Sequence, residues 1–222
     1  MLKGLWIERW RHKEEDVVDR QALSPHEAQE LLERQVHLQA ESRAVLADLD
    51  LMTMLRSAGH PVQIGSSVLG LMVWRDIDIH VYCDPVSADL AFETVRPLAS
   101  HPCITKLRYA NWSGPFSIAT LPDGYYWGIR YRTDVGVEWK IDVWFLPSTA
   151  GRTEETHMQH IRKRLTQESL LAILWIKDVW HRLPTYRHAV TSMDIYNAVL
   201  EHGVRTAAEF ETYLAQHGKQ QS

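Results

Sequence analysis

Two stretches of the chain alternate apolar and polar residues with period two, which is the pattern of half-buried β-strands. The first reads Asp-Ile-Asp-Ile-His-Val-Tyr over residues 76–82, and the second reads Val-Glu-Trp-Lys-Ile-Asp-Val-Trp-Phe over residues 137–145. Successive side chains on a strand point to opposite faces. Asp76, Asp78 and His80 therefore share the polar face of the first strand, and Asp142 lies on the polar face of the second.

The segments around these two strands are predicted to complete a sheet. A short apolar run at Val62–Ile64 indicates a strand that ends in a tight Gly65-Ser66-Ser67 turn. Further strands are expected at residues 103–109, 116–121 and 125–132, and the last two flank a Pro-Asp-Gly turn sequence. The pattern predicts an antiparallel meander beside the Asp76 strand, in a mixed sheet with helices behind it.

Helical spacing dominates the other parts of the chain. Ser24, Pro25 and Glu27 have the spacing of an N-cap, a first helical residue and a capping box, and the helix that they begin is expected to reach the break at 59–61, with one kink near 41–42. Asp84-Pro85 is expected to begin a second helix, which ends near residue 96. Residues 1–23 are expected to form a short amphipathic piece on the domain.

A Pro-Ser-Thr-Ala-Gly segment at residues 147–151 is the expected domain boundary. It separates a domain of mixed sheet and helices, residues 1–150, from a helical region, residues 151–222. Helices are expected in this region at residues 154–164, 167–183, 193–202 and 207–217, the last after a capping box from Thr206 to Glu209. The predicted fold class is α+β.

Composition narrows the functional classes. A net charge of -4 argues against a protein that coats nucleic acid, and the chain has only two cysteines, which predicts no disulfide framework and fits a reducing cytoplasm. We found no secretory signal and no apolar run long enough to span a membrane, so an intracellular, cytoplasmic protein with no membrane partner is expected.

Three pieces of the sequence together resemble the DNA polymerase beta-like nucleotidyltransferase superfamily. They are Ile64-Gly65-Ser66, then after nine intervening residues Asp76-Ile77-Asp78-Ile79, and later Ile141-Asp142-Val143. The resemblance covers about residues 60–146 and is closest in kind to enzymes that modify small molecules. It implies a mixed sheet backed by helices and a catalytic group made of Asp76, Asp78 and Asp142.

The resemblance also implies roles for these residues. Asp76 and Asp78 would bridge two Mg²⁺ or Mn²⁺ ions, while Asp142 would hold the catalytic ion and accept a proton. Gly65 and Ser66 would let the backbone approach the β- and γ-phosphates of a nucleoside triphosphate such as ATP. Three basic residues are candidates for phosphate binding from their strand positions, and surface ion pairs are the alternative for each: Lys140, Arg130 and Arg132.

The predicted function is metal-dependent transfer of a nucleoside monophosphate from a triphosphate to a hydroxyl of a small molecule. One alternative is a non-catalytic member of the fold that binds nucleotides or proteins, favoured by the unusual loop at residues 69–75. A second is a protein-modifying nucleotidyltransferase whose acceptor is a Tyr, Ser or Thr. The sequence leaves the acceptor, the base and the oligomeric state open.

Overall fold

The computed structural model describes residues 22–150, 153–186 and 188–219, and the chain divides into two compact units. One unit covers residues 36–162 and contains the sheet, and the other combines the residues before 36 with those after 162. Both boundaries fall inside helices, α2 (Pro25–Asp48) and α6 (Thr153–Arg164). The division expected near residue 150 stays a prediction. Most of the amphipathic piece expected at residues 1–23 lies outside the described residues.

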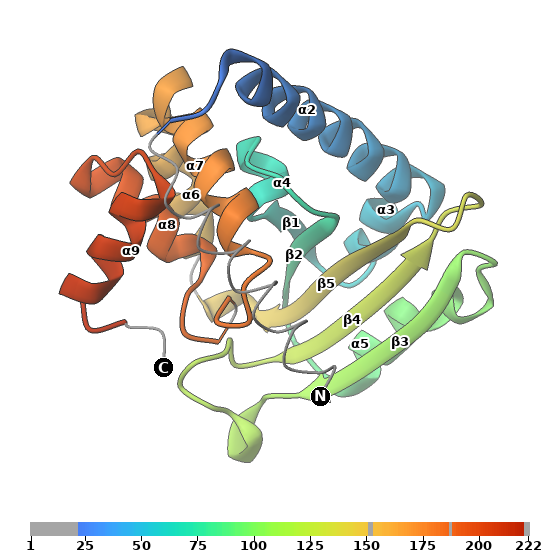
Figure 1. Cartoon of the computed structure of the whole chain (residues 1–222). Coiled ribbons are helices and arrows are strands. Elements are labelled where there is room, and N and C mark those ends of the chain that lie inside the picture. Colours follow the sequence, from blue (N-terminus) through green and yellow to red (C-terminus); the bar gives the residue numbers. More distant parts are fainter. Residues whose placement is uncertain (1–21, 151–152, 187, 220–222) are drawn as a thin grey trace, which may run out of the picture. The chain divides into compact units, whose positions relative to one another are not determined.

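Within the described residues, five strands form one sheet (Figure 1). The strands are β1 (His60–Ile64), β2 (Asp76–Cys83), β3 (Ile104–Asn111), β4 (Tyr125–Arg132) and β5 (Glu138–Pro147). Their order is β1-β2-β5-β4-β3, and β2 runs parallel to β5 while every other neighbouring pair is antiparallel. The predicted α+β class and the meander beside the Asp76 strand are confirmed.

The prediction of a strand at residues 116–121 is wrong. Strand β3 pairs directly with β4, from Asn111 opposite Tyr125, so the residues between them form a connection that contains only a short 3-10 turn at Gly114–Phe116. Phe116, Ile118 and Leu121 are exposed. These apolar side chains suggested a strand, but they have no core to pack against.

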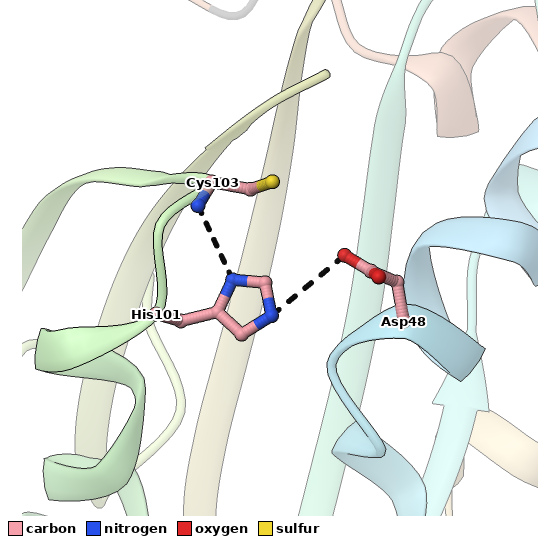
Figure 2. A group of neighbouring side chains, drawn as sticks. All are labelled: Asp48, His101 and Cys103. Atoms are coloured by element: carbon pink, nitrogen blue, oxygen red, sulfur yellow. Dashed lines mark hydrogen bonds and ion pairs between the residues drawn. The ribbon is translucent and has the colours of Figure 1, made fainter. Parts of the chain in front are cut away.

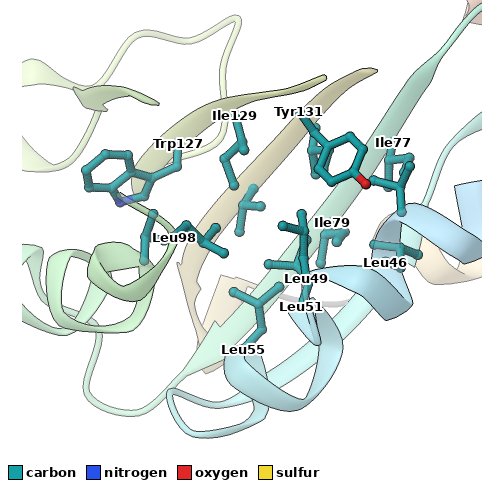
Figure 3. Packing of buried hydrophobic residues seen from close by; sticks show 14 of the residues in the cluster. Leu46, Leu49, Leu51, Leu55, Ile77, Ile79, Leu98, Trp127, Ile129 and Tyr131 are labelled. Carbon is teal, nitrogen blue, oxygen red and sulfur yellow. The ribbon is translucent and has the colours of Figure 1, made fainter. Parts of the chain in front are cut away.

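One face of the sheet packs on helices to form the core of this unit (Figure 3). The helices are the second half of α2, α3 (Leu51–Arg56) and α5 (Ala88–Val95). Ile77 and Ile79 of β2 are fully buried there, as are Leu51 and Leu55 of α3. Burial of each such side chain stabilises the fold by about 1.5–3 kcal/mol. Alternation along the strands then turns Asp76 and its polar neighbours to the opposite face of the sheet.

Two helix boundaries differ from the sequence expectation. The capping box is confirmed, since the Ser24 hydroxyl accepts from the Glu27 amide and the Glu27 carboxylate accepts from the Ser24 amide. The helix passes through residues 41–42 without a break and ends at Asp48, where Asp50 takes up a left-handed φ of 44°. Helix α5 begins after Ser87, whose hydroxyl accepts from the Leu90 amide, rather than after residue 84.

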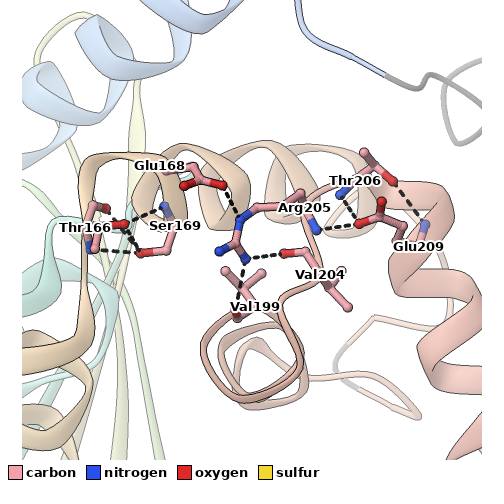
Figure 4. A network of polar contacts seen from close by, with 8 residues as sticks. All are labelled: Thr166, Glu168, Ser169, Val199, Val204, Arg205, Thr206 and Glu209. Carbon is pink, nitrogen blue, oxygen red and sulfur yellow. Dashed lines mark hydrogen bonds and ion pairs between the residues drawn. The ribbon is translucent and has the colours of Figure 1, made fainter.

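The second unit is helical. It contains α7 (Gln167–Trp180), α8 (Ser192–His202) and α9 (Ala207–Gln216). The buried rings of Trp180 and Phe210 pack edge to face, and their centroids are 5.1 Å apart. Arg205 donates to Glu168 and to two backbone carbonyls, and the predicted Thr206–Glu209 capping box follows it (Figure 4). Among the described helices, none is both long and apolar enough to cross a membrane.

Candidate active site

Three carboxylates converge on the face of the sheet that is turned away from the core. Asp76 and Asp78 come from β2 and Asp142 from β5, and the parallel pairing sets Asp78 directly beside Asp142. One oxygen from each of the three lies within 4.8 Å of the others. Asp76 is buried, and the other two are half-buried. The structure thus brings together the three acidic residues that the resemblance selected, and their catalytic roles stay a prediction.

Lys140 places a positive charge inside this group. Its Nζ lies 2.5 Å from Asp142 Oδ2 and 3.3 Å from Asp76 Oδ1, because Lys140 pairs with Asp76 across the β2–β5 ladder. Burial by itself lowers the pKa of Lys140, but the neighbouring carboxylates, Asp76 first, outweigh burial and raise it. The ammonium therefore stays charged and partly offsets the repulsion among the three carboxylates.

Two aromatic side chains support the carboxylates, and sequence reasoning missed both. The Tyr126 hydroxyl donates to Asp142 Oδ1 at 2.9 Å, and Trp74 Nε1 donates to Asp76 Oδ2 at 3.1 Å. Burial and then the nearby Asp142 charge raise the pKa of Tyr126, so the hydroxyl remains a donor. Alternation over residues 125–132 places Tyr126 on the face of Arg130. The pattern of one strand does not predict which residue of a neighbouring strand a side chain will contact.

Gly128 makes room for the Tyr126 contact. It lies directly opposite Asp142 in the β4–β5 pair. A Cβ at this position would lie only 2.6 Å from the Tyr126 hydroxyl oxygen, which is closer than real Cβ contacts allow. The missing side chain therefore lets the tyrosine hydroxyl reach the carboxylate.

Gly65 brings the Gly-Ser segment against the carboxylates. Its φ is 74°, a conformation that glycine adopts without strain, and a Cβ there would lie 2.7 Å from Asp78 Oδ2. Ser66, which is buried, then begins the short helix α4 (Ser66–Leu69) where a plain turn was expected. Backbone and carboxylate thus approach closely only because position 65 has no side chain.

The other two basic candidates lie in ion pairs with one acidic residue. Arg130 Nε and one terminal nitrogen of Arg132 are each 3.8 Å from the carboxylate of Glu138. All three side chains are at least 40% exposed. Such surface pairs contribute about 0–1 kcal/mol. A phosphate-binding role for these arginines stays a prediction.

The donor set of the three carboxylates fits a hard divalent cation. All the ligands it offers are carboxylate oxygens, which suit Mg²⁺ or Mn²⁺ better than softer ions. The position of the Lys140 ammonium between two of the carboxylates shows that the group already holds a cation there. Asp76, Asp78 and Asp142 are the residues that would hold the metal.

A second cluster of Asp48, His101 and Cys103 also brings three potential metal ligands within 4.8 Å (Figure 2). The Cys103 amide donates to His101 Nδ1 at 3.3 Å, and His101 Nε2 lies 3.7 Å from Asp48 Oδ2. Because Nδ1 accepts a hydrogen bond, the neutral ring carries its proton on Nε2, the nitrogen that faces the carboxylate. A metal on Nε2 would have to displace that proton. The Tyr131 hydroxyl also donates to Asp48, so the cluster is a hydrogen-bonded group.

Comparisons with known proteins agree with the fold. No protein-family model matches the sequence, and no curated protein matches it significantly. Among solved structures, an RNA terminal U-transferase described as cytoplasmic aligns with a TM-score of 0.53 at 15% identity, covering 79% of this chain and 55% of that one. The Cid1 poly(U) polymerase aligns with a TM-score of 0.51 at 14% identity and the same coverage. This chain spans about half the length of these proteins. At such low identity the likeness concerns the fold alone, and the chain has a nucleotidyltransferase-like α+β fold, as the resemblance implied.

Proposed function

We propose that this protein is a metal-dependent nucleotidyltransferase that moves a nucleoside monophosphate from a nucleoside triphosphate to a hydroxyl of a small molecule. The observation that carries the proposal is the convergence of Asp76, Asp78 and Asp142 against Gly65. Three carboxylates close together gain little as structure, since they repel one another. Three carboxylates beside the backbone of a glycine can bind a cation together with a phosphate.

The residues would have separate roles in the transfer reaction. The acceptor oxygen forms a bond to the α-phosphorus, the bond from that phosphorus to the bridging oxygen breaks, and pyrophosphate leaves. Asp142 accepts the proton of the attacking hydroxyl. Bound Mg²⁺ or Mn²⁺ would neutralise phosphate charge and lower the pKa of the acceptor hydroxyl. The backbone at Gly65 and Ser66 would contact the β- and γ-phosphates.

Lys140 would change partners when the site fills. Its ammonium now lies against Asp142 and Asp76. Divalent cations held by the same carboxylates would repel it, and the phosphates would attract it. We infer that Lys140 then contacts the triphosphate. The two free cysteines fit a reducing compartment, and we place the reaction in the cytoplasm.

The test is a titration followed by a turnover assay. ATP, CTP, GTP and UTP are titrated separately into the protein with Mg²⁺, with Mn²⁺ or with EDTA, and pyrophosphate release is then measured with pooled metabolites as acceptors. Metal-dependent binding and release are expected. Asp142→Asn should keep the fold and lower kcat by roughly a hundredfold or more, whereas Asp134→Asn, an exposed acid in the β4–β5 turn, should change neither.

Each alternative function has its own outcome in this assay. Metal-dependent binding without turnover for any acceptor would favour a non-catalytic nucleotide-binding module. Labelling of a protein rather than a metabolite from an α-³²P triphosphate would favour protein modification. Extension of an oligoribonucleotide would favour an RNA acceptor, the substrate class named for the two structures of similar fold. Equal triphosphate affinity with metal and with EDTA would overturn the metal role.

A further inference from the structure

A cavity of about 550 Å³ lies on the same face of the sheet as the three carboxylates. Its floor includes His80 and Tyr82 of β2 and Leu146 of β5. Since side chains on one strand face are separated by two residues, or roughly 7 Å, His80 follows Asp78 on this face. The cavity therefore begins within the length of one small molecule from the carboxylates. Its volume lies in the range of sites that bind small ligands.

The lining gives the cavity a definite charge. Two of the lining side chains are carboxylates, Asp123 from the β3–β4 connection and Glu154 from α6. Among the described residues that line it, none is a lysine or an arginine. The rest of the lining is mainly small or apolar: Ala119, Leu121, Pro122, Leu146, Pro147 and Ala150. A phosphate or a nucleic-acid backbone would meet repulsion here, whereas a cation with an apolar side would meet attraction.

The cavity also differs in place from the expected phosphate site. Gly65 approaches Asp78 so closely that a Cβ there would lie 2.7 Å from Oδ2. The cavity lies farther along β2, beyond Asp78 in the direction of Tyr82. A triphosphate that used the Gly65 backbone would therefore leave the cavity to the other substrate.

A buried imidazole supplies a polar group at the floor. His80 is 6% exposed, and its Nδ1 has no hydrogen-bond partner among the described residues. A buried polar atom without a partner costs free energy that a hydroxyl of a bound molecule would recover.

We propose that this cavity binds the acceptor and that the acceptor is a small hydroxyl-bearing molecule with a protonated amine. The proposal rests on the proposed function for the reaction, but its binding step needs neither metal nor triphosphate. The amine would lie near Asp123 and Glu154, and a hydroxyl near His80. The opposite end of the molecule would then reach the carboxylates of β2 and β5.

The binding test uses matched probes and the full chain in EDTA. Glucosamine, tri-glucosamine and tyramine are titrated beside their N-acetyl derivatives, which keep the hydroxyls and lose the charge. At least one amine should bind tenfold or more tightly than its N-acetyl partner. The double variant Asp123→Asn/Glu154→Gln should remove that preference, while Glu93→Gln, an exposed acid of α5, should preserve it.

Two further variants separate the cavity from the nucleotide site. Ala119→Trp places a large ring in the cavity from an exposed position, so it should weaken amine binding at least tenfold and leave triphosphate binding with Mg²⁺ unchanged. Val135→Trp, at an exposed position in the β4–β5 turn, is its control. His80→Phe should weaken amines and N-acetyl derivatives by the same factor, because the hydroxyls are common to both.

Three results would overturn the proposal. One is that no amine is preferred over its N-acetyl partner, and another is that the preference survives both the double variant and Ala119→Trp. The third is loss of triphosphate or U15 oligoribonucleotide binding in Ala119→Trp, which would assign the cavity to a nucleobase or to RNA. Failure of the proposed function is a separate observation, namely wild-type protein that binds no triphosphate with metal.

Discussion

Lys140 is the residue on which the charge balance of the candidate site depends. Its ammonium contacts two of the three carboxylates, and its side chain is only 21% exposed. Solvent therefore screens these contacts less than it screens a surface pair. The lysine stabilises the group when no metal is bound, and the same charge would compete with a divalent cation for the same oxygens.

Replacing Lys140 by methionine should make the protein depend on metal for stability. The Lys140→Met variant keeps the side-chain volume but leaves three carboxylates without the ammonium. The free energy of unfolding in EDTA should therefore fall by about 2 kcal/mol. Mg²⁺ should then raise the melting temperature of the variant more than that of the wild type. Thermal melts with EDTA and with excess Mg²⁺ measure both effects.

Lys106→Met, at an exposed position on β3, is the control and should melt like the wild type under both conditions. An equal Mg²⁺-induced shift in wild type and Lys140→Met would show that metal does not bind beside Lys140.

The two cysteines should differ in reactivity. Cys83 is buried in the core, and burial raises its pKa to about 11. A raised pKa keeps the thiol protonated, so roughly one molecule in a thousand carries the reactive thiolate at pH 8. Iodoacetamide at pH 8 should therefore modify the half-buried Cys103 and leave Cys83 unmodified until the protein is denatured. Peptide mass spectrometry of native and urea-unfolded samples would show which cysteine has been modified. Rapid native labelling of Cys83 would contradict its placement in the core.

At the scale of elements, the connection from β1 to α4 determines how close the backbone comes to the carboxylates. Gly65 joins the two with a positive φ, and the space beside it is occupied by Asp78. Any side chain at this position has to displace the carboxylate or the backbone.

Gly65→Ala should therefore disturb the site more than the fold. A backbone with φ 74° and ψ −157° is essentially restricted to glycine and costs an alanine about 1–3 kcal/mol, and the clash with Asp78 Oδ2 adds a local shift. Gly136→Ala, in the β4–β5 turn, has a φ of 85° and nothing within 4 Å of its Cβ, so it carries the strain without the clash. Both variants should remain folded and melt below the wild type, while only Gly65→Ala loses triphosphate binding. Equal binding by both would show that the close approach has no role in nucleotide recognition.

Gly128→Ala should release Asp142 from the contact that β4 provides. The added Cβ would lie 2.6 Å from the Tyr126 hydroxyl oxygen, so the tyrosine has to move away. Tyr126→Phe removes the same hydrogen bond without a clash, and both variants should lower kcat by a similar factor. A full kcat in Tyr126→Phe would mean that the hydrogen bond to Asp142 has no part in positioning it.

At the scale of the whole molecule, ligand binding should raise the free energy of unfolding. A ligand that binds only the folded protein stabilises it by about 2.7 kcal/mol at a hundred times its Kd. For a chain of 222 residues, each kcal/mol shifts the melting temperature by about 2–4 °C. A triphosphate with Mg²⁺ should therefore raise the melting temperature by several degrees, and the same triphosphate in EDTA should not.

Asp78→Asn is the variant that links this shift to the site. It removes one of the proposed metal ligands while keeping the size of the side chain, so it should abolish most of the Mg²⁺-dependent shift. If the shift persists in Asp78→Asn, the triphosphate binds elsewhere on the protein.

The features that the sequence by itself determined are local ones. Alternation over 76–82 and 137–145 decided which side chains share a face, because a strand repeats every two residues whatever its neighbours are. The capping boxes at Ser24 and Thr206 were equally clear, since their hydrogen bonds join residues only three apart. The three sequence pieces at residues 64–66, 76–79 and 141–143 were enough to suggest, by resemblance, the nucleotidyltransferase-like fold.

Tertiary structure decided everything that joins distant segments. Asp78 lies beside Asp142 only because β2 pairs in parallel with β5 in one register, and a shift by one residue would turn Asp142 to the other face. The Tyr126 contact and the course of residues 116–121 likewise depend on which strands become neighbours. Such pairings are set by the packing of the whole core, to which each local pattern contributes only a part.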